Sequence, residues 1–101
     1  MKVVWTEAAD TDRERIVLFI AADNPHAAIE LDALFTAAAD SLAALPFRGR
    51  IGRVADTREL VVHKNYILVY GHDALRATLY IKAVVHAALQ YPPEPVAPDR
   101  P

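Results

Sequence analysis

The sequence of 101 residues contains no cysteine. Disulfide bonds and metal sites built on thiolates are therefore excluded. The chain also lacks any apolar run near the ~18 residues that span a membrane, and its start, Met1–Glu7, lacks the long apolar region of a signal peptide. These absences predict a soluble protein of the cytoplasm.

An excess of positive charge is also missing. Eleven Lys and Arg residues stand against thirteen Asp and Glu residues, so the net charge is −2. Broad affinity for nucleic acid comes mainly from neutralising phosphates, so this balance argues against a general RNA- or DNA-binding protein. The four histidines are scattered over turns and one strand end, and we therefore expect neither a metal site nor any other cofactor.

Positive charge is nevertheless concentrated in one short window. We call its four arginines the basic strip: Arg48, Arg50, Arg53 and Arg58. Only Asp56 and Glu59 oppose them locally, and the window runs into the apolar, β-branched segments 60–62 and 66–70. Such segments favour strands. The pattern predicts a basic strip lying on a β-sheet.

The first half of the chain predicts one strand and two helices. Lys2–Trp5 is rich in β-branched and aromatic residues, as strands are. Thr6 can cap a helix that ends near Ala22 or Asp23, and Asn24 followed by proline can cap a second helix that ends before Pro46. Apolar residues at helical spacing are expected in the core: Ile16, Phe19, Ile20, Leu31 and Phe35.

The second half predicts four strands, at residues 50–54, 57–63, 66–70 and 75–86, with turns at 64–65 and 71–74. In the last strand, alternation places one set of side chains on a common face: Leu79, Ile81, Ala83 and Val85. Helices followed by strands give an α+β fold of order β-α-α-β-β-β-β, with a helical hairpin packed on a mainly antiparallel sheet. We expect residues 1–92 to form this one domain and residues 93–101 a proline-rich tail.

Several motifs follow one another along the chain. They are Asp23-Asn24-Pro25, Leu45-Pro46 with Gly49-Arg50, the signature Thr57-Arg58-Glu59-Leu60-Val61-Val62, the strand Tyr66–Tyr70, and Tyr91-Pro92. In this order and spacing they resemble the RelE/ParE family of bacterial toxins from type II toxin–antitoxin systems. The resemblance implies a plasmid-stabilising toxin that forms a hetero-oligomer with a cognate ParD-like antitoxin.

The family that the chain resembles has two branches. RelE-like members cleave messenger RNA on the ribosome, whereas ParE-like members poison DNA gyrase without being nucleases. The Asp-Asn-Pro turn and the Thr-Arg-Glu-Leu-Val-Val signature resemble the ParE-like branch. The resemblance therefore implies inhibition of DNA gyrase through protein–protein contact.

The chemistry of single residues agrees with the ParE-like branch. RNA cleavage needs an acid, a base and cations that hold the developing phosphate charge. RelE-like enzymes commonly carry an arginine after the tyrosine at position 66, where this chain has Ile67, and a further basic residue is missing from Ala87-Ala88-Leu89. We therefore expect a protein that is not an enzyme and does not bind nucleic acid directly. A RelE-type endoribonuclease and a degenerate toxin that only binds its antitoxin remain alternatives.

The resemblance also implies where partners bind. Antitoxins of this family wrap the toxin with a largely acidic segment, which basic side chains would meet: Arg50, Arg53, Arg58, Lys64 and Lys82. The edges of the apolar helix stripe could form a groove for an antitoxin helix. The residues expected to contact the target are His86, Leu89 and Tyr91. The competing interpretation is that the arginines form a solvated face and that His86 is structural.

Overall fold

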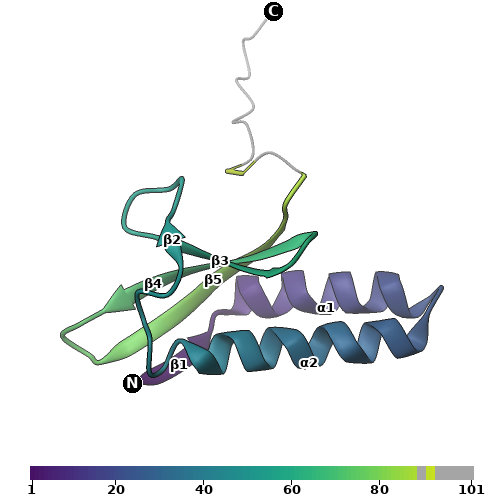
Figure 1. Cartoon of the computed structure of the whole chain (residues 1–101), viewed down its shortest axis with the longest axis horizontal. Helices are drawn as coiled ribbons and strands as arrows, with labels where there is room; N and C mark the ends of the chain where they lie inside the picture. The colour runs from purple at the N-terminus through teal and green to yellow at the C-terminus, as the bar shows by residue number, and fades with distance from the viewer. Residues whose placement is uncertain (89–90, 93–101) are drawn as a thin grey trace, which may run out of the picture.

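The computed structural model describes residues 1–88 and 91–92. Its elements are β1 (Lys2–Trp5), α1 (Glu7–Ala21), α2 (Pro25–Ser41), β2 (Arg50–Ile51), β3 (Arg58–His63), β4 (Tyr66–Asp73) and β5 (Thr78–His86). Figure 1 shows α1 and α2 side by side as a hairpin along one face of the sheet. The strand order is β1-β5-β4-β3-β2. Only β1 runs parallel to its neighbour, so the predicted α+β architecture is confirmed.

Both helices begin where the sequence predicts. The Thr6 hydroxyl accepts a hydrogen bond from the Ala9 amide at 3.2 Å, and the Asn24 side chain accepts one from Ala27 at 3.1 Å. These caps satisfy amide groups that have no partner within the helix. Neither helix in the described part of the chain is long and apolar enough to cross a membrane.

The end of α2 differs from the prediction. The helix stops at Ser41 rather than continuing to the residue before Pro46. The Ser41 hydroxyl donates to the Ala38 carbonyl at 2.7 Å, and the next amides bond over shorter spans, as at Leu42 to Ala39. A hydroxyl that bonds to the preceding turn competes with the helical ladder. The freed segment, residues 42–49, crosses from the helices to the sheet.

The core lies between the helices and the face of the sheet that they cover, here called the inner face. From the helices it receives Ala9, Leu31, Phe35, Ala39 and Leu42, and from the sheet Leu60, Leu68, Tyr70, Leu79, Ile81 and Val84. Ile16 and Ile20 pack against this cluster, but Phe19 is 81% exposed, so its predicted core position is wrong. Phe19 lies on the flank of the apolar stripe of α1, where neither α2 nor the sheet covers it.

A β-bulge in β5 changes which residues face the core. Tyr70 pairs with Ile81 but Val69 pairs with Ala83, so Lys82 is the extra residue. An extra residue reverses the alternation of side chains beyond it. Val84 therefore joins the core, and the prediction that Ala83 and Val85 share a face with Leu79 and Ile81 is wrong.

The strand boundaries also differ at two places. β2 covers only Arg50–Ile51, and β4 continues through Gly71 to Asp73, so the turn to β5 occupies residues 74–77 instead of 71–74. Gly71 marks a close approach within the sheet rather than a turn. A Cβ atom added there would lie 2.8 Å from Cε of Lys82.

Charge is divided between the two layers of the molecule. Residues 7–41, the helical hairpin, carry eight acidic and two basic side chains, whereas residues 48–86, which include β2 to β5, carry three acidic and seven basic ones. The helical layer is therefore strongly negative and the sheet layer positive, although the whole chain is close to neutral.

Candidate protein-binding site

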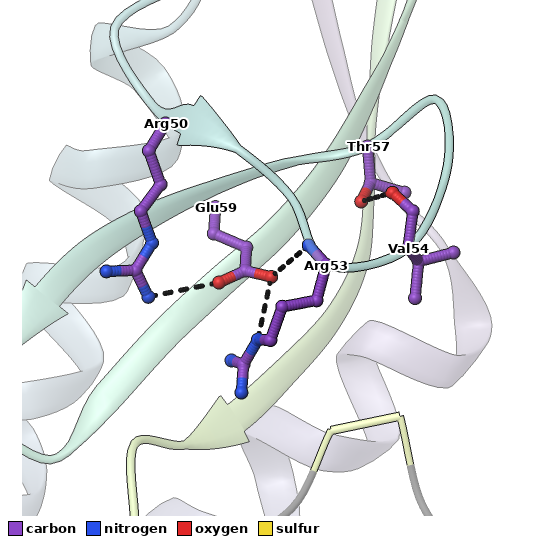
Figure 2. A network of polar contacts seen from close by, with 5 residues as sticks. All are labelled: Arg50, Arg53, Val54, Thr57 and Glu59. Atoms are coloured by element: carbon purple, nitrogen blue, oxygen red, sulfur yellow. Dashed lines mark hydrogen bonds and ion pairs between the residues drawn. The ribbon is translucent and has the colours of Figure 1, made fainter.

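The centre of the basic strip is a buried carboxylate. Glu59 lies on the outer face of the sheet, turned away from the helices, and its side chain is 1% exposed. Its Oε1 accepts from Nη2 of Arg50 at 3.0 Å, and its Oε2 accepts from Nε and the backbone amide of Arg53 at 3.1 and 2.9 Å (Figure 2). One acidic side chain therefore binds two of the predicted antitoxin-binding arginines.

The electrostatics of Glu59 follow from this geometry. Burial would raise the pKa of its carboxyl group, but the hydrogen bonds from Arg53 and Arg50 outweigh burial and lower the pKa from 4.5 to about 2. Glu59 therefore stays ionised at neutral pH and cancels part of the positive charge of both arginines.

The loop between β2 and β3 brings Arg53 to Glu59. The amide of Gly52 donates to the Thr57 carbonyl at 2.8 Å. The Thr57 hydroxyl donates to the Val54 carbonyl at 2.7 Å (Figure 2). These bonds close the loop on itself and place Arg53 above the sheet.

Arg58 has a different environment because it alternates with Glu59 along β3 and so projects from the inner face. Its Nη1 donates to the Gly49 carbonyl at 2.8 Å, and its guanidinium lies 4.9 Å from the centre of the Phe47 ring. These partners are uncharged. Among the residues that the structure describes, Arg58 forms no ion pair, so its charge is not cancelled as those of Arg50 and Arg53 are.

The two predicted lysines lie apart. Lys82 is exposed at the bulge and lies beside Gly71 on the outer face, whereas Lys64 is exposed in the turn between β3 and β4. The structure therefore gathers Arg50, Arg53 and Lys82 on the outer face, with Arg58 on the inner face and Lys64 at a separate turn.

Two of the three predicted target residues, His86 and Tyr91, line a groove between α1 and β5. The groove has a volume of about 580 Å³, and its walls are mostly apolar: Asp12, Arg15, Ile16, Phe19, Tyr66, Ala83, Val84, Val85, His86 and Tyr91. His86 packs edge-on against Tyr66, with ring centres 5.3 Å apart, and Tyr91 lies 5.6 Å from the guanidinium of Arg53. Leu89 and residues 93–101 lie outside the described residues.

The groove exposes an edge of the sheet. β1 covers β5 only as far as the pair Trp5–Ile81, so among the described residues no strand neighbours the edge beyond Ile81. There the Val84 amide donates to Oδ2 of Asp12 at 3.0 Å. Sequence reasoning did not include Asp12 in a site. The sequence does show an acidic residue, Asp12, among the apolar positions of α1. It does not show the partner of Asp12, because Val84 is 72 residues away.

A model of the ParE toxin of the type II toxin–antitoxin system parDE matches residues 3–91. The chain belongs to the ParE toxin family. It is thus the toxin component of a type II toxin–antitoxin system, within the wider ParE/RelE superfamily.

Two relatives support the family assignment of this ParE-family toxin. The toxin candidate Y4kP of Sinorhizobium fredii is 36% identical over 92 residues, which cover 90% of this chain and 93% of the relative. Toxin RelE2 of Caulobacter vibrioides is 40% identical over 88 residues, which cover 86% and 96%. The relatives therefore span nearly the whole domain.

Two solved structures share the fold of this ParE-family toxin. The chromosomal ParDE system of P. aeruginosa aligns with a TM-score of 0.74 and 18% identity, covering 85% of this chain and 95% of the other. The toxin–antitoxin complex RelBE2 of Mycobacterium tuberculosis aligns with a TM-score of 0.63 and 24% identity, covering 84% and 95%.

Proposed function

We propose that this toxin inhibits DNA gyrase through protein–protein contact, without enzymatic activity, and that a cognate ParD-like antitoxin neutralises it in a hetero-oligomer. The observation that carries the proposal is the ionised Glu59 between Arg50 and Arg53. A site that cleaves RNA presents free cations to phosphate oxygens. Here a fixed negative charge occupies the centre of the arginine cluster.

The surroundings of Glu59 support contact with protein rather than RNA. The outer face beside Glu59 is aliphatic, because Ile67 and Val69 on β4 are buried there and Val61, two residues after Glu59 on β3, is 55% exposed. Stacking surfaces for bases are typically aromatic. Partly neutralised arginines above an apolar surface suit a protein partner, since arginine is enriched at protein interfaces.

The groove between α1 and β5 fits the antitoxin. An amphipathic helix or an extended segment of a partner can bury apolar side chains in such a groove, and the edge beyond Ile81 can pair with a strand. Phe19, 81% exposed at the rim, is a ready anchor. The solved structures of a ParDE system and of the RelBE2 toxin–antitoxin complex agree with a partner of this kind.

Neutralisation follows if one groove serves both partners. His86 and Tyr91, the residues predicted to contact gyrase, line the groove that the antitoxin is proposed to fill. A bound antitoxin would then hide them from the target. Competition for one surface explains neutralisation without any change in the fold of the toxin.

One observation favours the ribonuclease alternative. The Tyr66 ring lies between two imidazoles, 6.0 Å from His63 and 5.3 Å from His86, and these are groups that can transfer protons. However, Nδ1 of each histidine accepts a backbone amide, from Asn65 and Ala88 respectively. The neighbouring positions Ile67, Ala87 and Ala88 supply no cation for phosphate.

The proposal is tested on DNA gyrase with purified toxin and on messenger RNA in cells that express the toxin. DNA supercoiling and DNA cleavage by gyrase are measured with and without toxin, and messenger RNA is examined by primer extension after toxin expression. We expect inhibited supercoiling and intact messenger RNA, with both activity and growth restored by antitoxin. Codon-associated cuts in messenger RNA would establish the ribonuclease instead. Normal growth, with neither effect, would establish a degenerate toxin.

A further inference from the structure

A second cavity lies on the inner face, beyond the end of α2. Its volume is about 350 Å³, and its walls are Phe47, Ile51, Asp56, Thr57, Arg58, Tyr70, Gly71 and His72. It is separate from the groove between α1 and β5, with which it shares no residue.

The wall formed by the segment before β2 is held rigidly. The Tyr70 hydroxyl donates to the Pro46 carbonyl at 2.8 Å and accepts from the Gly49 amide at 2.9 Å. Arg58 donates to the Gly49 carbonyl from the next strand. Three bonds from two neighbouring strands thus fix this short segment, so the cavity is formed before any partner arrives and binding need not order it.

The rim of the cavity is apolar and open. Phe47 is 62% exposed and Ile51 is 75% exposed, although both belong to residue types usually buried. Both line the cavity with Arg58: Phe47 stacks on its guanidinium, and Ile51 is its partner in the pairing of β2 with β3. Two large aliphatic or aromatic surfaces therefore share the cavity with one cation.

Among the described residues, Arg58 is the arginine of the basic strip that both lines this cavity and forms no ion pair with a carboxylate. Arg50 and Arg53 share Glu59, and Arg48 donates to the Ser41 hydroxyl at 2.7 Å on the helix side. Within residues 1–88 and 91–92, Arg58 bonds only to carbonyl oxygens, through Nη1. Asp56 lines the same cavity but forms no ion pair with Arg58 in the described part of the chain. A planar guanidinium with spare donors suits a carboxylate bound through two oxygens.

The wall also contains a nitrogen without a partner. Nε2 of His72 is buried and makes no hydrogen bond within the part of the chain that the structure describes. Its ring packs edge-on against Phe47, with ring centres 5.5 Å apart. A buried polar atom without a partner is uncommon and costs free energy. Movement of the exposed Phe47 ring would open this nitrogen to a group in the cavity.

We propose that this cavity is a subsite for an acidic segment of the antitoxin. A carboxylate of the segment binds Arg58, and an adjacent apolar side chain packs between Phe47 and Ile51. Arg58 is thus the anchor of this subsite, and Arg50 and Arg53 contribute less because Glu59 partly neutralises them. The identity of the occupant rests on the proposed neutralisation by antitoxin.

Two matched pairs of variants test the subsite. Ile51→Glu and Ile51→Lys change the same exposed rim position with opposite charges, and Ile29→Glu and Ile29→Lys make the same changes on α2, where Ile29 is 69% exposed. Affinity for the purified cognate antitoxin is measured by calorimetry at low and high salt. Thermal unfolding of each variant confirms that it is folded.

We expect Ile51→Lys to bind about tenfold more tightly than Ile51→Glu at low salt, because the glutamate repels the incoming carboxylate. High salt should shrink this ratio, and the Ile29 pair should differ by less than about threefold. Equal affinities of the two Ile51 variants, or an equal ratio in the Ile29 pair, would overturn the subsite. If the wild-type toxin itself does not bind antitoxin, the proposed neutralisation fails, which is a result distinct from a failure of the Ile51 variants alone.

Discussion

At the scale of single residues, Glu59 decides what the basic strip can do. A count of charges from residue 48 to residue 58 suggests a free positive surface, yet two of the four arginines bind one carboxylate. The sequence shows that acidic and basic residues both occur in this window, but it does not show that Arg50 and Arg53 pair with Glu59. That pairing depends on the register of the short β2 against β3 and on the closed loop at residues 52–57.

Replacing Glu59 by glutamine should destabilise the protein. The change keeps the size of the side chain but leaves two arginines without their anionic partner, and the loss should be about 2 kcal/mol in the free energy of unfolding. Urea denaturation measures it. As a control, Asp73→Asn removes one charge of an ion pair with Arg76, whose side chain is 74% exposed, and should lower the urea midpoint much less. Equal midpoints for the wild type and Glu59→Gln would contradict the central role of this carboxylate.

Glu59 should also make stability depend on acid pH. Its pKa is about 2 in the folded state and 4.5 ordinarily, so the unfolded chain binds more protons between these values. The stabilisation is therefore complete above about pH 4.5 and is lost as the pH falls toward 2, by about 3 kcal/mol in total. Urea midpoints at pH 7, 4.5, 3 and 2, compared with those of Glu59→Gln, isolate this contribution. Parallel curves for the two proteins would show that another group is responsible.

At the scale of elements, the sequence was sufficient to predict a helix boundary where a single capping residue determines it. Thr6 and Asn24 fix the starts of α1 and α2 because each side chain bonds to the backbone three residues on. The bulge at Lys82 and the length of β4 were not predictable, because they depend on pairing between distant strands. The groove was not predictable for the same reason, because Asp12 of α1 contacts Val84 of β5 only once the helix packs on the sheet.

Asp12 should stabilise the uncovered edge of β5. Its carboxylate accepts the amide of Val84, a residue that is only 5% exposed. Asp12→Ala leaves this amide without a partner and should cost about 1–2 kcal/mol, whereas Asp12→Asn, which keeps an acceptor oxygen, should cost less. Chemical denaturation distinguishes the two. The exposed neighbour Asp10 is the control, and a similar loss for Asp10→Ala would indicate a general effect of charge on α1.

At the scale of the whole molecule, the fold leaves large apolar side chains outside its single core. Phe19 was expected in the core because it keeps helical spacing with Ile16 and Ile20. However, α2 and the five-stranded sheet cover only one flank of α1, and Phe19 lies on the other. The family fold was therefore predictable from the order of motifs. The binding surfaces were not, because they consist of residues that the layers fail to cover.

Phe19→Ser should separate binding from stability. The side chain is 81% exposed, so the unfolding temperature should change little, while affinity for the antitoxin should fall about tenfold if Phe19 anchors the partner in the groove. Titration calorimetry and thermal unfolding measure the two quantities. Leu75→Ser, at a position that is 100% exposed in the turn before β5, should alter neither. A large loss of stability with unchanged affinity would place Phe19 in the core after all.

The separation of charge between the helical and sheet layers has a kinetic consequence. The hairpin carries eight acidic and two basic residues, whereas residues 48–86 carry three acidic and seven basic ones. The electrostatic potential around the molecule is therefore negative on the helical side and positive on the sheet side, even though the net charge is only −2. An acidic partner is repelled from the helical side and attracted to the sheet side before any contact forms. Encounters are thus oriented in advance, and added salt should slow association much more than it hastens dissociation.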